Sequence, residues 1–282
     1  MLGIIGGTGL YKMDELENIK TEVVSTPFGA PSSEITLGTL ANQRVAFLPR
    51  HGKQHQHLPS DINFRANIWA LKAVGVTQIL SVSAVGSLRE EVKPGDLAVP
   101  NQYFDWTRGK RPSTFFGDGL VAHISTAEPS CSRLSEKIQA SSHKTDIQVH
   151  KNKTYACVEG PRLGSRAESS FLRQSSCDLV GMTNVPEVFL AREAQICYCT
   201  IAVVTDYDCW LDDPNQHASV DKVMELYRNN IGKVQTLIKA VIGDISRSTV
   251  TCQCRQSLQF AVMTPEASLT SENFEKLKFL RK

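Results

Sequence analysis

The stretch Ile201-Ala202-Val203-Val204-Thr205-Asp206-Tyr207-Asp208 decides the fold, because an apolar, β-branched run passes directly into two carboxylates. Such a run predicts a buried strand, and ligands of open α/β sheets bind beyond the carboxyl ends of their strands. Residues two apart in an extended chain project to the same side. We therefore expect Asp206 and Asp208 to face one pocket. The alternative is that they cap a following helix or turn.

The pairing of two carboxyl groups also points to chemistry. Like charges held close together resist ionising together, so one group of such a pair can keep a proton near neutral pH. A buried carboxyl that keeps its proton is a general acid. The sequence thus favours a proton donor at the end of this strand.

Length and composition are those of an ordinary globular protein. Of 282 residues, 41% are hydrophobic and 21% charged, which suffices for one large core. Strand-like and helix-like patterns alternate without a linker, which favours one α/β domain over residues 1–282. The net charge of +2 gives no reason to expect nucleic acid or membrane as a partner. Without a basic leader or a membrane-length apolar run, the expected location is the cytoplasm.

Eight cysteines in a chain of this length are unremarkable. Several lie in apolar, strand-like segments, where a free cysteine behaves as a small hydrophobe. The exception is Cys252-Gln253-Cys254, whose spacing allows either a strained redox pair or two reduced thiols.

The amino terminus carries a candidate anion site. Leu2-Gly3-Ile4-Ile5 predicts a short buried strand that runs into Gly6-Gly7-Thr8-Gly9. Small residues permit unusual dihedral angles and close approach of backbone N–H groups, which favours an anion cradle. The run lacks the full glycine spacing of a dinucleotide site. A plain tight turn therefore remains the alternative.

A second candidate anion site follows the expected strand at residues 44–49. Arg50 and His51 come directly after it and suit an oxyanion clamp, while His55 and His57 follow in the loop. No carboxylate or cysteine stands at a recognised ligand spacing, so we expect no metal here. The two later histidines are then polar groups of the site or of the surface.

Turns rich in small and hydroxyl residues recur at other expected strand ends. Gln78–Ser87 predicts a strand ending in such residues, and Gly181-Met182-Thr183 forms a turn before a helix that starts near Pro186. From Ser219 a long apolar stripe predicts a helix in which Met224 packs in the core, although its first turn could wall a pocket. One pocket would account for all these turns.

The chain resembles the 5′-methylthioadenosine phosphorylases, within the trimeric purine nucleoside phosphorylase group, nearly end to end. The blocks that carry the resemblance are Ile5-Gly6-Gly7-Thr8-Gly9-Leu10, Arg50-His51-Gly52, Asn67-Ile68-Trp69-Ala70-Leu71-Lys72, Gly86-Ser87-Leu88-Arg89-Glu90-Glu91, Glu159-Gly160-Pro161-Arg162, Met182-Thr183 and Thr205-Asp206-Tyr207-Asp208-Cys209-Trp210. It implies a single domain built on a twisted mixed β-sheet, partly closed into a barrel and surrounded by helices. The segment from about residue 266 is then either a capping helix or a frayed end.

The resemblance also implies a reaction. Phosphate would attack the anomeric carbon of a nucleoside as the purine departs, which makes the enzyme a pentosyltransferase with inorganic phosphate as co-substrate and no cofactor. Asp206 would protonate N7 of the purine, and Asp208 would lie near the 6-amino group. The residues implied around phosphate are Thr8, Arg50, His51, Ser83, Ala84 and Thr183, with Met182 against the ribose.

The remaining implied contacts surround the 5′ end of the nucleoside. An apolar wall suits a methylthio group better than a hydroxyl. The resemblance implies a homotrimer in which His123 reaches in from a neighbouring subunit. The other residues implied at this end are His55, Val220, Val223, Met224 and Met263.

Three departures from the family pattern fall at the base. Leu163 stands where a stacking Phe is usual, Gly164 where Ser is common, and Gly181 where Asn often precedes Met-Thr. Carboxylate acceptors at Asp206 and Asp208 favour a 6-amino purine. The sequence therefore favours methylthioadenosine, with a 6-oxopurine nucleoside or methylthioinosine phosphorylase, or a non-catalytic nucleoside-binding paralogue, as alternatives.

Overall fold

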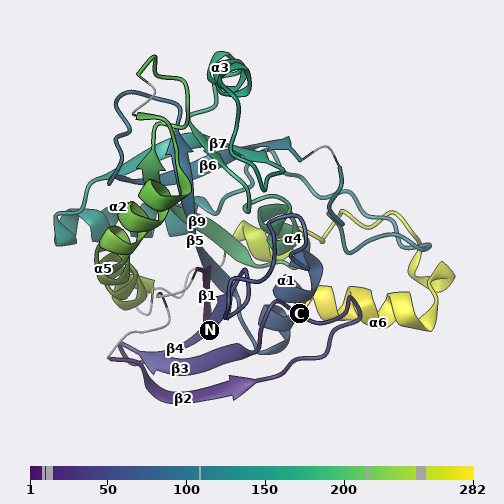
Figure 1. The fold of residues 1–282 in the computed structure, drawn as a ribbon. Coiled ribbons are helices and arrows are strands. Elements are labelled where there is room, and N and C mark those ends of the chain that lie inside the picture. The colour runs from purple at the N-terminus through teal and green to yellow at the C-terminus, as the bar shows by residue number, and fades with distance from the viewer. Residues whose placement is uncertain (8–9, 11–14, 108, 214–215, 246–251) are drawn as a thin grey trace.

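A mixed β-sheet of nine strands runs through the centre of the protein in the computed structural model, which describes residues 1–7, 10, 15–107, 109–213, 216–245 and 252–282 (Figure 1). The strand order is β2-β3-β4-β1-β5-β8-β7-β6-β9, and β9 pairs back onto β5. Strands β5 to β9 therefore close into a barrel, from which the other four extend, and this confirms the predicted architecture. The strands are β1 (Leu2–Gly6), β2 (Glu17–Glu22), β3 (Ile35–Leu40), β4 (Gln43–Pro49), β5 (Gln78–Ser87), β6 (Leu97–Trp106), β7 (Val149–Val158), β8 (Leu179–Gly181) and β9 (Cys197–Asp206).

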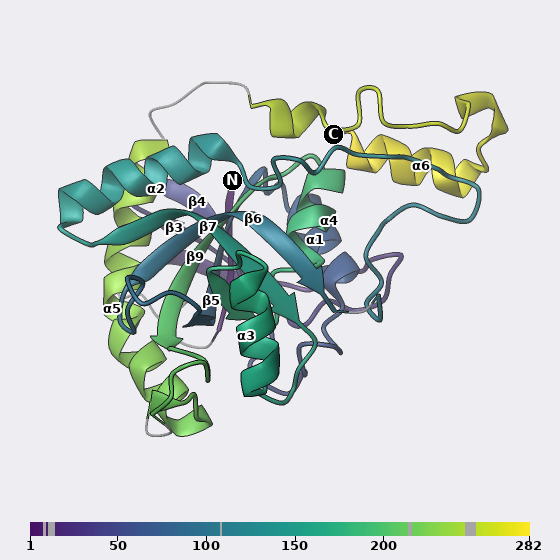
Figure 2. The same cartoon turned by 90° about the horizontal axis from the view of Figure 1, so that it is seen from above.

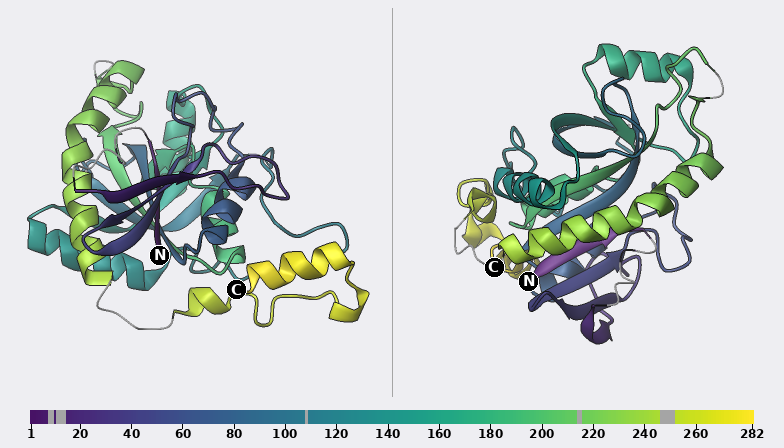
Figure 3. Two further views of the ribbon diagram at one scale, coloured as in Figure 1. Left: turned by 90° about the horizontal axis from the view of Figure 1, so that it is seen from below. Right: turned by 90° about the vertical axis from the view of Figure 1, so that its left-hand side faces the viewer.

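Helices cover both faces of the sheet, and each face has its own apolar core. Helices α2 and α5 pack on one face through residues such as Leu134 and Ile238, while α1 and α4 pack on the other through Ile68 and Val188 (Figure 1). Figure 3 shows α5 running along the sheet. The helices are α1 (Phe64–Ala73), α2 (Ser132–Thr145), α3 (Arg166–Gln174), α4 (Glu187–Glu193), α5 (Val220–Ile245) and α6 (Ser271–Leu280).

Helix α1 has a side-chain cap at its start and a glycine after its end. The side chain of Asn63 accepts a hydrogen bond from the backbone N–H of Ala66 and so caps the first turn. At the other end, Gly75 has φ +91°, a left-handed conformation that suits glycine after a helix. These two residues set the helix ends.

Four strands deliver their carboxyl ends to one edge of the sheet, because β4, β1, β5 and β9 are parallel. The pairing of β5 with β9 is regular up to Val85 opposite Val204, and then shifts so that Gly86 lies opposite Asp206. Thr205 is the extra residue of this bulge. Bulges of this kind re-aim side chains next to functional sites.

The C-terminal segment lies beside the long connection that follows β6 (Figure 2). The N–H of His123 donates to the carbonyl of Ala261 at 2.8 Å, and the N–H of Met263 donates to the carbonyl of Val121 at 2.9 Å. Helix α6 then returns to the body of the protein, where Phe279 stacks on Trp69 of α1 with ring centroids 4.0 Å apart. Among the helices that the structure describes, none has both the length and the apolar character needed to cross a membrane.

Candidate active site

A cavity of about 400 Å³ opens where β4, β5, β8 and β9 end, within the size range of small-molecule sites. Its lining comes from segments far apart in sequence, as the sequence predicted for one shared pocket. The predicted site residues that line it are Arg50, His51, His55, Ser83, Ala84, Leu163, Gly164, Met182, Thr183, Asp206, Asp208, Val220, Val223 and Met224.

Two of the predicted residues are absent from the described lining of this cavity. Thr8 lies outside the described residues, although Gly7 beside it does line the cavity. His123 and Met263 lie instead in the paired segments on either side of the Ala122–Val262 bridge. Within a single chain these two residues are therefore close to each other in the fold and absent from the cavity lining.

The carboxylate of Asp206 is held by two short hydrogen bonds. The hydroxyl of Thr205 donates to Oδ2 at 2.7 Å, and the backbone N–H of Asp208 donates to Oδ1 at 2.7 Å. Burial raises the pKa of Asp206, the two hydrogen bonds oppose this, and the nearby charge of Asp208 adds a smaller rise. A fixed carboxyl with a raised pKa is suited to proton donation.

Asp208 reaches the same cavity by a different route from the one predicted. Strand β9 ends at Asp206, and Asp208 has φ +52° in a left-handed turn, so strand alternation does not orient it. The hydrogen bond from its N–H to Asp206 is that of an Asx turn. Both sequence interpretations hold in part, since Asp206 shapes a turn and both carboxyl groups face one cavity. Burial raises the pKa of Asp208 as well.

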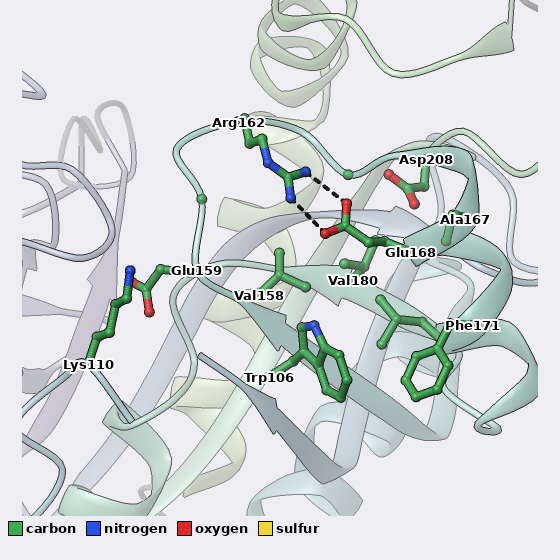
Figure 4. Close-up of a pocket in the computed structure, with 14 residues that line it drawn as sticks. Trp106, Lys110, Val158, Glu159, Arg162, Ala167, Glu168, Phe171, Val180 and Asp208 are labelled. Carbon is green, nitrogen blue, oxygen red and sulfur yellow. Dashed lines mark hydrogen bonds and ion pairs between the residues drawn. The ribbon is translucent and has the colours of Figure 1, made fainter. Parts of the chain in front are cut away.

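A second cavity of about 380 Å³ adjoins the first, and Asp208 and Gly164 line both. Figure 4 shows the side chains of Arg162 and Glu168 pointing toward each other beside Asp208, with their oxygen–nitrogen distances at 2.7 and 2.8 Å. Trp106 lies across the cavity from this ion pair. The space beside Asp208 is thus bounded by charged groups on one side and an aromatic ring on the other.

One edge of the Arg50 guanidinium, formed by Nε and Nη2, makes a buried ion pair. Its Nε and Nη2 donate to the two carboxylate oxygens of Glu187 at 2.8 and 2.9 Å, and Nη1 donates to the carbonyl of Val82. Nη2 also donates to Ser81. One of the five guanidinium N–H groups remains for a ligand. The Arg50 guanidinium was expected to bind an oxyanion, but its two-pronged edge binds the carboxylate of Glu187.

His51 is neutral in its partly buried position. Its Nδ1 lies 2.9 Å from the carbonyl oxygen of His57, and since a carbonyl can only accept, Nδ1 carries the proton. Burial lowers the pKa of His51 to about 4, and the charge of Arg50 contributes to the lowering. Nε2 is then left as an acceptor, and the ring stacks on that of His55 with centroids 4.4 Å apart.

The hydroxyl groups of Ser83 and Thr183 lie at the same end of the cavity as Arg50 and His51. Ser83 is buried and its hydroxyl lies 3.3 Å from Oδ1 of Asn184, whose Nδ2 donates to the hydroxyls of Ser81 and Tyr198. Thr183 is buried next to Asn184. This network fixes the strand-end hydroxyls against the Arg50–Glu187 pair.

The apolar wall is open to solvent in the single chain. Val220 is 68% exposed and Met224 38% exposed, both in the first turns of α5. The prediction that Met224 packs in the core is wrong, because the helix extends past the sheet edge here and only its later turns are buried. An exposed apolar surface beside a cavity indicates that a ligand or another chain covers it.

Gly181 is the departure at the base site that has a structural cause. A Cβ on Gly181 would lie 2.1 Å from the hydroxyl oxygen of Tyr155, so the space that a side chain would need is already filled. A Cβ on Gly164 would lie 3.7 Å from both carboxylate oxygens of Asp208, an ordinary contact. Leu163 lines the cavity and is 38% exposed.

Sequence reasoning missed two residues of the site. Glu187, in the helix expected to start near Pro186, was not predicted as a site residue, yet it is completely buried and also accepts from Tyr198 at 2.8 Å. Its place in the first turn of α4, where an acidic residue favours the helix N-terminus by itself, gave no signal of a second role. Tyr227 counted as one member of the apolar stripe of α5, and it lines the cavity close to Gly7.

Comparisons with known proteins agree with this arrangement. The family model described as the phosphorylase superfamily matches residues 1–242. S-methyl-5′-thioadenosine phosphorylase of Geobacter sulfurreducens is 44% identical over 280 residues, which span 99% of this chain and 97% of that one.

Solved structures give the same result. A methylthioadenosine phosphorylase from an Antarctic soil metagenomic library has a TM-score of 0.94 at 43% identity, covering 99% of this chain and 98% of the other. Methylthioadenosine phosphorylase from Schistosoma mansoni, in complex with adenine, has a TM-score of 0.84 at 37% identity, covering 88% and 92%. With its barrel, its strand-end cavity and its full-length relatives, the chain belongs to the methylthioadenosine phosphorylases of the phosphorylase superfamily.

Proposed function

We propose that this protein catalyses the phosphorolysis of 5′-methylthioadenosine to adenine and 5-methylthioribose 1-phosphate. The observation that carries the proposal is Asp206, a buried carboxyl group with a raised pKa that shares one cavity with the hydroxyl groups at the ends of β5 and β8. The relatives named above support the choice of substrate. Phosphate is the only co-substrate of this reaction, and no cofactor takes part.

The phosphate would lie among Ser83, Ala84, Thr183 and His51, with Thr8 as a further predicted contact. Hydroxyl and amide donors match the acceptor oxygens of phosphate. Because Glu187 neutralises Arg50, the guanidinium offers a single N–H and the hydroxyl groups carry most of the recognition. Phosphate would then attack the anomeric carbon from the side opposite the departing base.

The purine would lie against Asp206 and Asp208. Adenine is a poor leaving group as an anion, and a proton delivered to N7 while the glycosidic bond breaks removes that charge. Asp206 is the donor in this proposal, and Asp208 accepts from the 6-amino group. Met182 would contact the ribose, and Leu163 and Gly164 would lie beside the base.

The methylthio group would lie against Val220, Val223 and Met224, whose exposure in the single chain supports a homotrimer. A neighbouring subunit would bring His123 and Met263 to this open wall, with His55 nearby. Met263 is 64% exposed and Val121 44% exposed in the segments that carry them, as expected for residues that a partner covers. The cytoplasmic location expected from the sequence stays a prediction.

A 6-oxopurine substrate is the second candidate. Burial raises the pKa of Asp208, and a protonated Asp208 would donate to O6, which an ionised one would repel. Gly164 provides no hydroxyl to hold Asp208 in the ionised form. The same cavity would then select inosine or methylthioinosine.

The test is release of free base from methylthioadenosine, methylthioinosine, adenosine and inosine, with and without phosphate, for the wild type and Asp206→Asn. Phosphate-dependent adenine release from methylthioadenosine is expected, with kcat about 10²- to 10⁴-fold lower in Asp206→Asn. Asp244→Asn, at the distal end of α5, is the matched control and should keep wild-type activity. Release from 6-oxo substrates alone would establish the second candidate, and no release from any would leave a nucleoside-binding paralogue.

A further inference from the structure

Four cysteine side chains converge at the end of the barrel opposite the active site. The Sγ atoms of Cys131, Cys197, Cys252 and Cys254 all lie within 4.8 Å of one another. Cys131 precedes the first turn of α2, Cys197 begins β9, and the other two flank the start of a short 3₁₀ helix, Gln253–Gln256. Three separate segments of the chain thus meet here: two contribute one thiol group each, and the third contributes two.

The sulfur separations match a tetrahedral metal site. With Zn–S bonds of about 2.3 Å, tetrahedral geometry places the sulfurs about 3.8 Å apart. The Sγ of Cys252 lies 3.5 Å from the Sγ of Cys131 and 3.5 Å from that of Cys254. Four sulfurs in such an arrangement are typical of zinc or iron sites.

The backbone holds the ligands in place. The N–H of Cys131 donates to the carbonyl of Tyr198 at 2.8 Å, which ties the start of α2 to β9. The N–H of Cys197 donates to the carbonyl of Thr77 at 3.1 Å. Cys131, Cys197 and Cys254 are buried, and Cys252 is partly exposed, which leaves an entry path for a metal ion.

The surroundings favour negative charge. Four thiolates around a divalent cation carry a net charge of −2, which needs compensation in a buried place. The guanidinium Nη2 of Arg133 lies 3.9 Å from the Sγ of Cys197. Cys131 occupies the N-cap of the fourteen-residue helix α2, and the positive end of a helix dipole favours a nearby thiolate.

We propose that these four cysteines bind one structural Zn²⁺ ion. The protein fills all four coordination positions, which is the arrangement of structural zinc sites rather than catalytic ones. The site and Asp206 lie at opposite ends of β9, nine residues or about 30 Å apart. The metal therefore takes no part in phosphorolysis.

The expected role of the site is to fasten residues 252–282 to the barrel. This segment carries Ala261 and Met263, which pair with the connection after β6, and helix α6, which returns to α1. Removing the ion should lower the melting temperature and expose this segment to protease ahead of the rest of the chain.

The experiment measures zinc by mass spectrometry and free thiols by titration in protein purified without added reductant or chelator. One zinc per chain is expected in the wild type and none in the double variant Cys252→Ser/Cys254→Ser. Cys177→Ser removes a buried thiol from a different core cluster and should keep its zinc. If the double variant does not fold, zinc released from the wild type by a thiol-modifying mercurial gives the stoichiometry directly.

Three outcomes would overturn the proposal. Disulfides among these cysteines with no metal would make the cluster a redox element. Four free thiols that take up no zinc when it is supplied would leave it as core packing. Iron in place of zinc would refute the identity of the ion. None of these readouts depends on catalytic activity.

Discussion

The backbone N–H of Asp208 lies 2.7 Å from Oδ1 of Asp206 and donates a hydrogen bond to it, so the turn that places one carboxyl group also holds the other. The second oxygen of Asp206 is bound by the hydroxyl of Thr205. Both bonds stabilise the ionised form and oppose the effect of burial on the pKa of Asp206. Phosphorolysis needs Asp206 in its protonated form. The pKa that governs this form therefore depends on burial and on the two hydrogen bonds, and substitutions can shift it.

Because Asp206 must be protonated to act as the acid, we expect kcat to fall as the pH rises through its raised pKa. Thr205→Val removes a hydrogen bond that favours the ionised form, so the fall should move to higher pH. Thr205→Ser keeps the hydroxyl and should leave the profile in place. Measuring kcat against pH for the three proteins tests this, and an unmoved profile in Thr205→Val would contradict it.

The absence of a side chain at Gly86 provides the space for the carboxylate of Asp206. A Cβ on Gly86 would lie 2.8 Å from Oδ1 of Asp206 and 3.2 Å from Cβ of Asp208. Gly86→Ala should lower kcat at least tenfold, since small misplacements of catalytic groups are costly. Gly232→Ala is the matched control: a Cβ there meets nothing, and the change should stabilise α5 by up to about 1 kcal/mol with unaltered kcat. Equal activity in both variants would refute the crowding argument.

Gly164 lies against the carboxylate of Asp208, since a Cβ at this position would lie 3.7 Å from both oxygens. A serine at this position would bring its hydroxyl within reach of the Asp208 carboxylate and stabilise the ionised form. Gly164→Ser should therefore raise the ratio of kcat/KM for methylthioadenosine over methylthioinosine, whereas Gly164→Ala should not. Steady-state kinetics on the two substrates measure the ratio. A similar change in both variants would point to bulk instead of hydrogen bonding.

His51 should stay neutral in the free protein to below pH 6. Burial lowers its pKa to about 4, against about 6.5 in the unfolded chain. The unfolded state then binds more protons between these two values, so the stability that the neutral form contributes is present above pH 6.5 and lost as the pH falls toward 4. Nuclear magnetic resonance titration of the ring measures this pKa directly. A value near 6.5 would contradict the burial seen here.

The same titration reports on phosphate. Nδ1 of His51 is bound to the carbonyl of His57, so only Nε2 is left to meet a ligand. An anion beside the ring favours the charged imidazolium, and added phosphate should raise the pKa. Sodium chloride at equal ionic strength is the control.

Glu187→Gln should destabilise the protein by about 3–5 kcal/mol, because it leaves the buried charge of Arg50 without its partner. Ser81→Ala removes the hydrogen bonds of this hydroxyl with Glu187, Arg50 and Asn184 but leaves the two charges paired, so it should cost less, about 1.5–3 kcal/mol. Urea unfolding of both variants gives the comparison. A loss below 1 kcal/mol for Glu187→Gln would mean that water reaches the pair.

Much of the fold could be predicted because its signals are local. The strand at Gln78–Ser87 matches β5 at both ends, since its β-branched residues and small-residue exit lie within one continuous run. The site could be assembled in outline because parallel strands bring their ends together without any knowledge of side-chain contacts. Arg50 and His51 follow strand β4, Asp206 ends strand β9, and all three line the cavity.

The missed features depend on contacts between distant residues. No pattern along the chain shows that Glu187 meets Arg50, which lies 137 positions away. The bulge at Thr205 is a property of two paired strands, so strand alternation alone gave an incomplete account of Asp208. The Cys252–Cys254 pair was noted, but its proximity to Cys131 and Cys197 comes only from the folded chain.

Closure of the barrel also limits aggregation through exposed sheet edges. The ring of β5 to β9 has no free edge, so the described sheet ends in one open strand, β2. An open edge is a template on which another chain can add a strand and start aggregation. All six residues of β2 are exposed, and Glu17, Lys20 and Glu22 are charged. A second β-strand would have to desolvate these charges in order to pair, which protects the edge at high protein concentration.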